Sequence, residues 1–372
     1  MKPNRSLVTP HQATAIVVNT IISGRLLILP RELATIAGTG SWAVLILGSM
    51  ITLVIMSIYT TAGRRFQNSS LPQYAVKTLG LFVGGLLSLL FAASWLVTAA
   101  LASRIFAAVI ITSVLPRVSL EIGILVMLLL GSHLATKDIT IVARVHELFL
   151  PFVVGTIFLL IVPALARVSI WRLLPLIPFD SLRPVGLGTL AATTSFLGFE
   201  VISLFMPFYS EPHKAKRSHS LGLFMVAAVY LLVVVGSIGL SGVSKLIRIQ
   251  WPTLTLIRMI SYHGIFTRLE APFLAVYVIV MFTTIGSLLF GVVSTLSDLF
   301  KIKSRTTWPY LLVIPAYYLA IKPQNIVEVE QIARLALFIR LGVVLTVPLI
   351  VLPIAVIRGK EDRPGEREAT HS

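Results

Sequence analysis

Two ionisable side chains, Arg25 and Glu200, lie inside segments that are otherwise apolar. Each is within two positions of a glycine, Gly24 or Gly198, and about half of the chain separates the two glycines. A carboxylate at such depth costs roughly 2.5–3.5 kcal/mol on insertion scales, so it should be paired, protonated or turned toward water. We expect Arg25 to be the partner of Glu200. The pair, or one member of it, would contact the charged ends of a ligand or titrate during gating.

Both segments are interrupted at these positions. TAIVVNTIISGRLLILPRELA breaks at Ser23–Arg25, and VGLGTLAATTSFLGFEVISLFMPF breaks at Thr194–Glu200. Unwound backbone inside a bilayer is tolerated only where it lines a protein cavity or water. A break frees amide donors, which suit a carboxylate, and carbonyl acceptors, which suit a cation or an ammonium group. An amino acid offers both groups, and interrupted helices at corresponding places in two halves indicate a transporter-type binding site with inverted repeats.

Purely structural roles are the alternatives. Glycine is common in membrane helices because it permits close packing, and an Arg25–Glu200 ion pair could simply lock two helices together.

Further polar residues in apolar segments have two interpretations each. Arg104 and Arg340 lie nearer to the predicted helix ends, where long basic side chains reach the interface. Trp95 lies in the middle of its segment, away from the aromatic belt that suits the other tryptophans. With Ser94 and Thr98, it either lines the cavity or packs against neighbouring helices.

Soluble-enzyme chemistry has no support in the sequence. The chain has no cysteine, which excludes disulfide frameworks, thiolate metal sites and cysteine nucleophiles. His146-Glu147 is not an HExxH motif, the seven histidines are scattered, and neither a P-loop nor a GxGxxG motif occurs. We therefore predict no catalytic residue, no metal site and no cofactor.

Composition identifies the environment of these segments. Of the 372 residues, 56% are hydrophobic and 12% are charged, and the mean hydropathy is +0.92. Soluble domains average about 45–50% apolar and roughly 25% charged residues, so the chain is expected to be a multi-pass protein of the lipid bilayer. The net charge of +16 comes from basic residues between apolar runs, which membrane topology explains better than nucleic-acid binding.

A membrane helix needs about 20 mainly apolar residues, and ten candidate runs are present. They fall near 12–35, 41–62, 79–106, 118–136, 147–165, 186–208, 219–241, 271–297, 307–321 and 335–357. The third could extend from Leu79 to Val114 as one long tilted helix, and the ninth is short and contains two prolines.

The predicted fold is an all-α integral membrane domain over residues 1–362, with one repeat over about 10–165 and a second over about 184–357. Because five helices per repeat is an odd number, the second repeat enters the membrane from the opposite side. A polar cytoplasmic tail covers 358–372, and the N-terminal stretch lacks a cleavable signal. With both termini cytoplasmic, more basic residues fall in the inner segments than in the outer ones, as the positive-inside rule requires.

Three stretches carry a family resemblance. They are IISGRLLILPRELATIAGTGSW, SFLGFEVISLFMPF, and WPTLTLIRMI followed by FTRLEAPFL with its Arg268-Leu269-Glu270. Together they resemble the B subunits of nutrient germinant receptors, the spore germination permease family, over roughly residues 7–357. The resemblance implies the fold of the amino acid–polyamine–organocation superfamily, which is a five-plus-five inverted repeat of ten helices.

The resemblance also implies a role and partners. Members lie in the inner membrane of bacterial spores with an A subunit and a lipoprotein C subunit, and they bind a small germinant such as an amino acid. The ligand-lining positions that it implies are Ser23, Gly24, Leu26, Thr194, Ser195, Phe196, Gly198 and Glu200. Arg25 stands where the family usually has a small residue, so it would fill part of the pocket or anchor an anionic ligand. Trp95, Thr98, Thr284 and Ser287 complete the candidate set.

Two other functions remain open. An active amino-acid or ion-coupled transporter would share the fold, and fold alone does not decide function. A sodium site would need oxygen ligands near the first break and on the eighth helix, where Thr283, Thr284 and Ser287 occur, although helical hydroxyls more often bond to their own backbone. The third possibility is a structural subunit whose cavity is vestigial.

Overall fold

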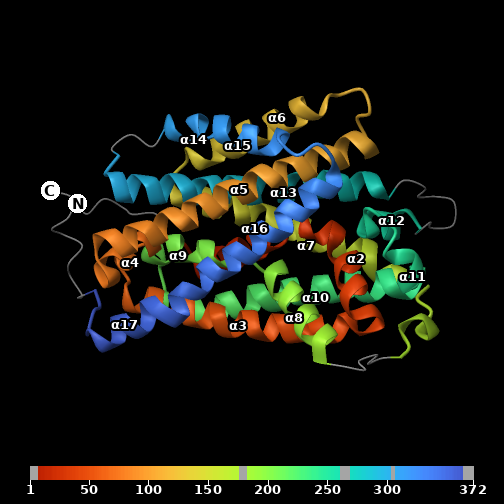
Figure 1. Cartoon of the computed structure of the whole chain (residues 1–372), viewed down its shortest axis with the longest axis horizontal. Helices are drawn as coiled ribbons and strands as arrows, with labels where there is room; N and C mark the ends of the chain where they lie inside the picture. The colour runs from red at the N-terminus through yellow and green to blue at the C-terminus, as the bar shows by residue number, and fades with distance from the viewer. Residues whose placement is uncertain (1–6, 176–181, 260–268, 303–305, 363–372) are drawn as a thin grey trace.

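The computed structural model describes residues 7–175, 182–259, 269–302 and 306–362. The secondary structure of this part of the chain is helical, apart from one isolated bridge between Val8 and Tyr209. Most helices run along the long axis of the molecule (Figure 1). Counting α2 with α3, six described helical stretches are long and apolar enough to cross a membrane, and seven if one bent pair forms a single span.

Each of the ten predicted runs coincides with helix, which confirms the predicted all-α membrane fold. In chain order the segments are α1 (Pro10–Ile21) with α2 (Arg25–Ala37), α3 (Ser41–Arg65), α5 (Leu81–Ser113), α6 (Leu120–Ala135), α7 (Ile139–Leu165), α8 (Leu182–Ser195) with η3 (Phe199–Val201), α9 (Ile202–Phe205) and η4 (Met206–Phe208), α10 (Ala215–Ser241), α13 (Glu270–Phe300), α14 (Trp308–Leu311) with α15 (Val313–Ile321), and α16 (Ile326–Thr346) with η6 (Val347–Val351) and α17 (Leu352–Ile357). Short helices connect them: η1 (Gly38–Gly40), α4 (Leu71–Leu79), η2 (Ile170–Leu173), η5 (Pro212–Lys214), α11 (Val243–Leu246) and α12 (Pro252–Arg258).

The third and the ninth predicted segments were the irregular ones, and only the ninth is interrupted in the structure. The third segment is one uninterrupted helix, α5, as expected. The ninth is divided between α14 and α15 at Leu312. Pro315 explains this division because it has no N–H to donate to the carbonyl of Leu311, and its ring crowds that carbonyl.

The start of the last segment is a correction. The sequence predicted a helix from residue 335, but α16 begins at Ile326, where the side chain of Asn325 accepts a hydrogen bond from the Glu328 N–H at 2.9 Å. The first turns of α16 are charged, and a tertiary contact orders them, since Glu330 forms an ion pair with Arg31 at 2.6 Å. The helix is therefore longer at its N-terminal end.

The core of the bundle is α13, which packs against α5, α6, α7 and α1. Of its most apolar window, 78% is buried by protein, against 39% for α5. Gly131 of α6 illustrates the close packing, because a Cβ there would lie 2.7 Å from a side-chain atom of Ile285. The lipid-facing helices enclose a protein-filled centre in which both interrupted segments lie.

One end of the bundle gathers the connecting helix α4 and the C-terminal ends of the predicted sixth and last spans. Figure 1 shows α4, α9 and α17 together at this end. The Val8 N–H donates to the Phe208 carbonyl at 2.8 Å, and Asp362 both donates from its N–H to the Arg65 carbonyl at 3.2 Å and pairs with Lys77 at 2.6 Å. This arrangement fits the predicted alternation of loops. The tail beyond Asp362, and Arg268 of the third motif, lie outside the described residues.

Candidate functional site

The first break separates α1 from α2 and exposes the last carbonyls of α1, which have no intrahelical partner. Side chains of two other helices satisfy them. The hydroxyl of Tyr230 on α10 donates to the carbonyl of Ile21 at 2.9 Å. The hydroxyl of Thr284 on α13 donates to the carbonyls of Asn19 at 3.0 Å and Ile22 at 3.4 Å. The break is thus held open by protein contacts, as unwound backbone within a membrane requires.

A proline keeps a further carbonyl free on α2. Pro30 has no N–H, so the carbonyl of Leu26 loses its helical partner. The hydroxyl of Thr253 donates to this carbonyl at 2.6 Å. The Leu-Pro sequence that follows the break therefore has a structural reason, which is to present backbone oxygen to the neighbouring helix α12.

The second break lies between α8 and η3, where the two helical parts are bent by 43°. Gly198 has φ 131°, which favours glycine strongly. A Cβ at this position would lie 2.3 Å from the carbonyl oxygen of Thr20, so the backbones of the two breaks touch here. The first and sixth segments therefore contact each other at their interruptions.

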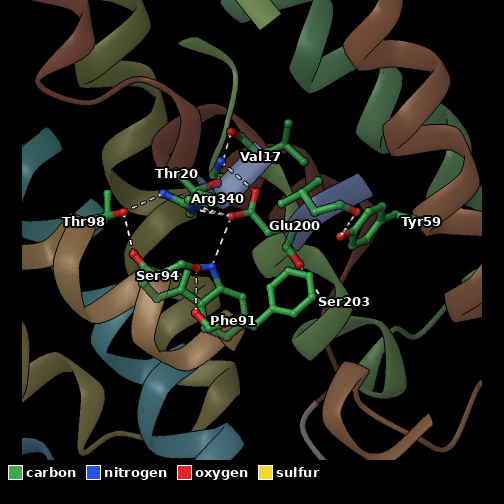
Figure 2. A network of polar contacts seen from close by, with 12 residues as sticks. Val17, Thr20, Tyr59, Phe91, Ser94, Thr98, Glu200, Ser203 and Arg340 are labelled. Carbon is green, nitrogen blue, oxygen red and sulfur yellow. Dashed lines mark hydrogen bonds and ion pairs between the residues drawn. The ribbon is translucent and has the colours of Figure 1, made fainter. Parts of the chain in front are cut away.

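Glu200 is the centre of a buried polar network, shown in Figure 2. Its Oε2 accepts the N–H of Gly198 at 2.9 Å, and its Oε1 accepts the indole N–H of Trp95 at 3.1 Å. Oε1 also accepts the Nε–H of Arg340 at 2.7 Å, and the second guanidinium contact completes an ion pair. The predicted Arg25–Glu200 pair is therefore wrong, and Arg340 is the partner.

The expectation that Arg340 snorkels fails for a physical reason. Because α16 begins at Ile326 and continues into η6 and α17, Arg340 lies near the middle of the helical segment rather than near its end. It is only 2% exposed and turns inward, where it also donates to the hydroxyl of Thr98 at 3.3 Å. Arg104, the other arginine expected to reach the interface, is likewise buried and donates to the carbonyl of Pro323 at 3.1 Å.

Trp95 and Thr98 belong to this network rather than to plain packing. The Thr98 hydroxyl, which accepts a hydrogen bond from Arg340, donates to the Ser94 carbonyl at 2.7 Å. Gly291 of α13 gives the Trp95 ring its space, since a Cβ there would lie 2.8 Å from the indole. The network consequently joins α5, the second break and α16.

Arg25 has a different set of partners. Its guanidinium pairs with Glu32 at 2.7 Å, two turns further along α2, and donates to the hydroxyl of Ser195 at the end of α8 at 2.9 Å. The two charged side chains are 13% and 11% exposed. Arg25 therefore contacts both interrupted segments, but its counter-charge comes from its own half-helix rather than from Glu200.

Buried polar groups beside the first break are left without hydrogen-bond partners among the described residues. They include the Nε of Arg25 and the hydroxyl of Tyr277. The Tyr277 oxygen lies 3.7 Å from the position that a Cβ on Gly24 would occupy. An unmade hydrogen bond of a buried donor costs about 1–3 kcal/mol, so these two donors are suited to a ligand acceptor.

The other predicted residues differ in what they contact. The Ser23 carbonyl accepts the Leu26 N–H at 3.0 Å, and Leu26 itself packs in the core. Thr194 bonds its own helix at Ala191, 2.8 Å away, and Phe196 packs against the ring of Tyr230 at 5.4 Å. Their role in binding a ligand stays a prediction.

A second buried cluster was not foreseen. Ser287 contacts the Nε2 of His146 on α7 at 2.7 Å, and the Asn19 amide donates to the His146 carbonyl at 2.7 Å. Thr283 bonds to its own helix at the carbonyls of Ile279 and Val280, both at 3.0 Å. The sequence signal for the cluster was a polar residue in the middle of an apolar run, as at Asn19, but it gave no indication of a partner.

Comparison with known proteins agrees with the family resemblance of the three sequence stretches. Residues 7–329 match the family described as spore germination protein. Spore germination protein A2 of Bacillus subtilis (strain 168) is 30% identical over 328 residues, which cover 84% of this chain and 86% of the relative. Spore germination proteins B2 and KB of the same organism are 23% and 24% identical, and each alignment covers 98% of this chain, with 99% and 98% of the relatives.

Solved transporter structures share the fold. The nucleobase-cation-symport-1 family transporter Mhp1 superposes with a TM-score of 0.61 at 13% identity, covering 88% of this chain and 75% of the transporter. A manganese transporter from Eremococcus coleocola gives a TM-score of 0.60 at 12% identity, covering 93% and 78%. This likeness shows the fold alone, a LeuT-like five-plus-five arrangement in which the first and sixth helices are interrupted.

Family and fold together indicate a receptor or transporter-like membrane protein rather than an enzyme. One conclusion follows from the motifs around Gly24 and Gly198, from the contact between the two breaks and from the match over most of the chain. This chain belongs to the spore germination protein family.

Proposed function

We propose that this chain is the B-type subunit of a nutrient germinant receptor and that it binds a small germinant, an amino acid, between the two breaks. The observation that carries the proposal is the direct contact of the breaks at Gly198 and Thr20, together with buried donors at the first break that have no partner among the described residues. Residues 7–329 match the spore germination family, and two relatives are named B2 and KB.

The chemistry of the proposed pocket favours a ligand with a carboxylate. Arg25 presents a guanidinium whose Nε has no partner among the described residues, although the group also pairs with Glu32. Tyr277 presents a hydroxyl that has no hydrogen-bond partner among these residues. Guanidinium and carboxylate form strong, charge-assisted hydrogen bonds. Binding would draw Arg25 from Glu32 toward the ligand, which links occupancy to the position of α2.

The site would report ligand binding through the Glu200 network. Because Glu200 accepts from the Gly198 backbone and from Arg340, any shift of the second break also moves the contact with α16. A ligand changes such an equilibrium only by its differential affinity for the two arrangements. The partners that would read this change are the A and C subunits, in the spore inner membrane, with both termini of this chain in the cytoplasm.

The second candidate is an active amino-acid or ion-coupled transporter, which the shared transporter fold favours. Thr284 and Ser287 offer oxygens near the first break, where the Thr284 hydroxyl donates to two carbonyls and the Ser287 hydroxyl shares a hydrogen bond with His146. The receptor is ranked first because residues 7–329 match the spore germination family, whereas the likeness to transporters concerns the fold alone.

Two measurements on the purified protein separate the functions. Binding of a panel of amino acids is followed by calorimetry, and counterflow of the same compounds is followed in liposomes. Binding without flux supports the receptor, and flux supports the transporter. The absence of both would show a structural subunit and would overturn the proposal.

A further inference from the structure

A groove of about 380 Å³ opens on the outer surface between α3 and α10, away from the two breaks. It is lined by Leu53, Val54, Ser57, Ile58, Thr61, Lys216 and Ser220. Val54 is 60% exposed, so the groove faces the surrounding lipid rather than the protein core. None of its residues takes part in the contacts of the candidate site.

The lining changes from apolar to polar along the groove. Leu53 and Val54 lie about three turns before the end of α3 at Arg65, whereas Thr61 lies only about one turn before it. Lys216 lies in the first turn of α10. The groove therefore has aliphatic walls at membrane depth, and hydroxyls and an ammonium group near the membrane surface, which is the polarity of a phospholipid.

Positive charge concentrates at the polar end of the groove. The N-terminus of α10 carries the positive end of a 27-residue helix, which attracts anions. Lys214 is neutralised by Glu211 at 2.6 Å, but Lys216 forms no ion pair with any residue that the structure describes. The Thr61 hydroxyl donates to the Ser57 carbonyl at 2.9 Å, which leaves the hydroxyls of Ser57 and Ser220 beside the Lys216 ammonium. These three groups suit a phosphate group, and basic pockets between membrane helices are sites for anionic head groups.

The wall behind the groove is fixed by buried hydrogen bonds. The hydroxyl of Thr60 on α3 contacts His219 Nδ1 on α10 at 2.8 Å, and the Tyr209 hydroxyl contacts His219 Nε2 at 2.8 Å. These residues adjoin Thr61 and Ser220 of the lining. These buried hydrogen bonds fix how α3 and α10 pack behind the groove.

We propose that this groove binds one anionic phospholipid from the adjoining leaflet. Its acyl chain lies along Leu53, Val54 and Ile58, and its phosphate is held by Lys216 with the hydroxyls of Ser57 and Ser220. The proposal is independent of the germinant site, because it uses a separate surface and a different class of ligand.

The test measures lipid binding by native mass spectrometry of the full chain in detergent, with palmitoyl-oleoyl phosphatidylglycerol as the probe and the matching phosphatidylcholine as comparison. Lys216→Gln is expected to weaken phosphatidylglycerol binding about fivefold, since one basic residue near the head group contributes on that scale. Ser57→Phe, which fills the groove without changing charge, is expected to weaken binding as well. Arg217→Gln is the matched control, because this neighbour on α10 does not line the groove.

The expected result is weaker phosphatidylglycerol binding in Lys216→Gln and Ser57→Phe, whereas the affinity of Arg217→Gln should stay within twofold of that of the wild type. Equal losses in Lys216→Gln and Arg217→Gln would reveal diffuse electrostatic attraction and overturn the proposal. Equal binding of phosphatidylcholine, or displacement of phosphatidylglycerol by millimolar glycerol 3-phosphate, would also overturn it. If Ser57→Phe fails to fold, the comparison of Lys216→Gln with Arg217→Gln decides alone.

Discussion

Arg340 on α16 and Glu200 at the second break form an ion pair that the protein buries almost completely, with side-chain exposures of 2% and 0%. Glu200 is held at the same time by the backbone of its own break and by Trp95 of α5. This pair connects the last membrane segment to the interruption at which the ligand is proposed to bind. It is also the contact on which the first prediction rests.

Removing one partner of this pair should destabilise the protein strongly. Arg340→Met leaves a buried carboxylate without its counter-charge, at a cost of about 3–5 kcal/mol. Adding Glu200→Gln should recover part of the loss, because a neutral amide is less costly to bury. Thermal unfolding in detergent measures both variants. Arg334→Met, at an exposed position of the same helix, is the control, and its free energy of unfolding should lie within about 0.5 kcal/mol of the wild type. Rescue of Arg25→Met by Glu200→Gln would contradict the assigned pairing.

Gly198 should not tolerate alanine. The added Cβ would lie 2.3 Å from the Thr20 carbonyl, and φ 131° is unfavourable for any residue with a side chain. We expect Gly198→Ala to lower the unfolding temperature sharply or to prevent accumulation in the membrane. Gly155→Ala in α7 is the matched control, since nothing lies within 4 Å of its Cβ position and alanine is the better helix former. Equal behaviour of the two variants would mean that the breaks do not touch.

Arg25 should determine which ligands bind. Arg25→Gly removes the guanidinium from the break, so affinity for ligands with an additional negative charge should fall about tenfold, which corresponds to about 1.4 kcal/mol. Calorimetry on a panel of acidic, neutral and basic amino acids measures the change. Arg334→Gln, at an exposed position of α16, removes a positive charge away from the breaks and should leave the ranking unchanged. A ranking that survives Arg25→Gly would remove Arg25 from the site.

The hydroxyl of Tyr277 should matter for the ligand more than for stability. It has no hydrogen-bond partner among the described residues, so Tyr277→Phe should change the free energy of unfolding by less than about 1 kcal/mol. If the hydroxyl donates to the bound ligand, the same variant should weaken binding roughly fivefold to tenfold. Tyr230→Phe gives the contrast, because its hydroxyl supports the Ile21 carbonyl and its loss should destabilise the protein. Unchanged binding in Tyr277→Phe would place the ligand elsewhere.

Much of the fold can be predicted from local properties. Runs of about 20 apolar residues require membrane helices, and glycines beside ionisable residues at equivalent places in two halves indicate the interruptions. Pro315 likewise accounts for the division of the ninth segment. These inferences need only chain chemistry and the bilayer, because each concerns what a single segment can do in lipid.

The partners of the buried charges could not be predicted in this way. Arg25, Arg104 and Arg340 each lie in an apolar segment and look alike in the sequence. Which of them reaches Glu200 depends on where α16 begins and how it is rotated against α5 and the second break. Asn325 and the Arg31–Glu330 contact extend the helix to Ile326 and bring Arg340 to the centre of the membrane segment.

The sequence by itself thus determined that this protein is a helical membrane protein, where its two breaks lie, and that a carboxylate is buried at one of them. Only the tertiary structure decided that Arg340 neutralises Glu200 and that Arg25 pairs with Glu32. The physical reason is that burial makes an unpaired charge costly wherever it occurs, whereas the choice of counter-charge depends on the packing of helices far apart in the chain.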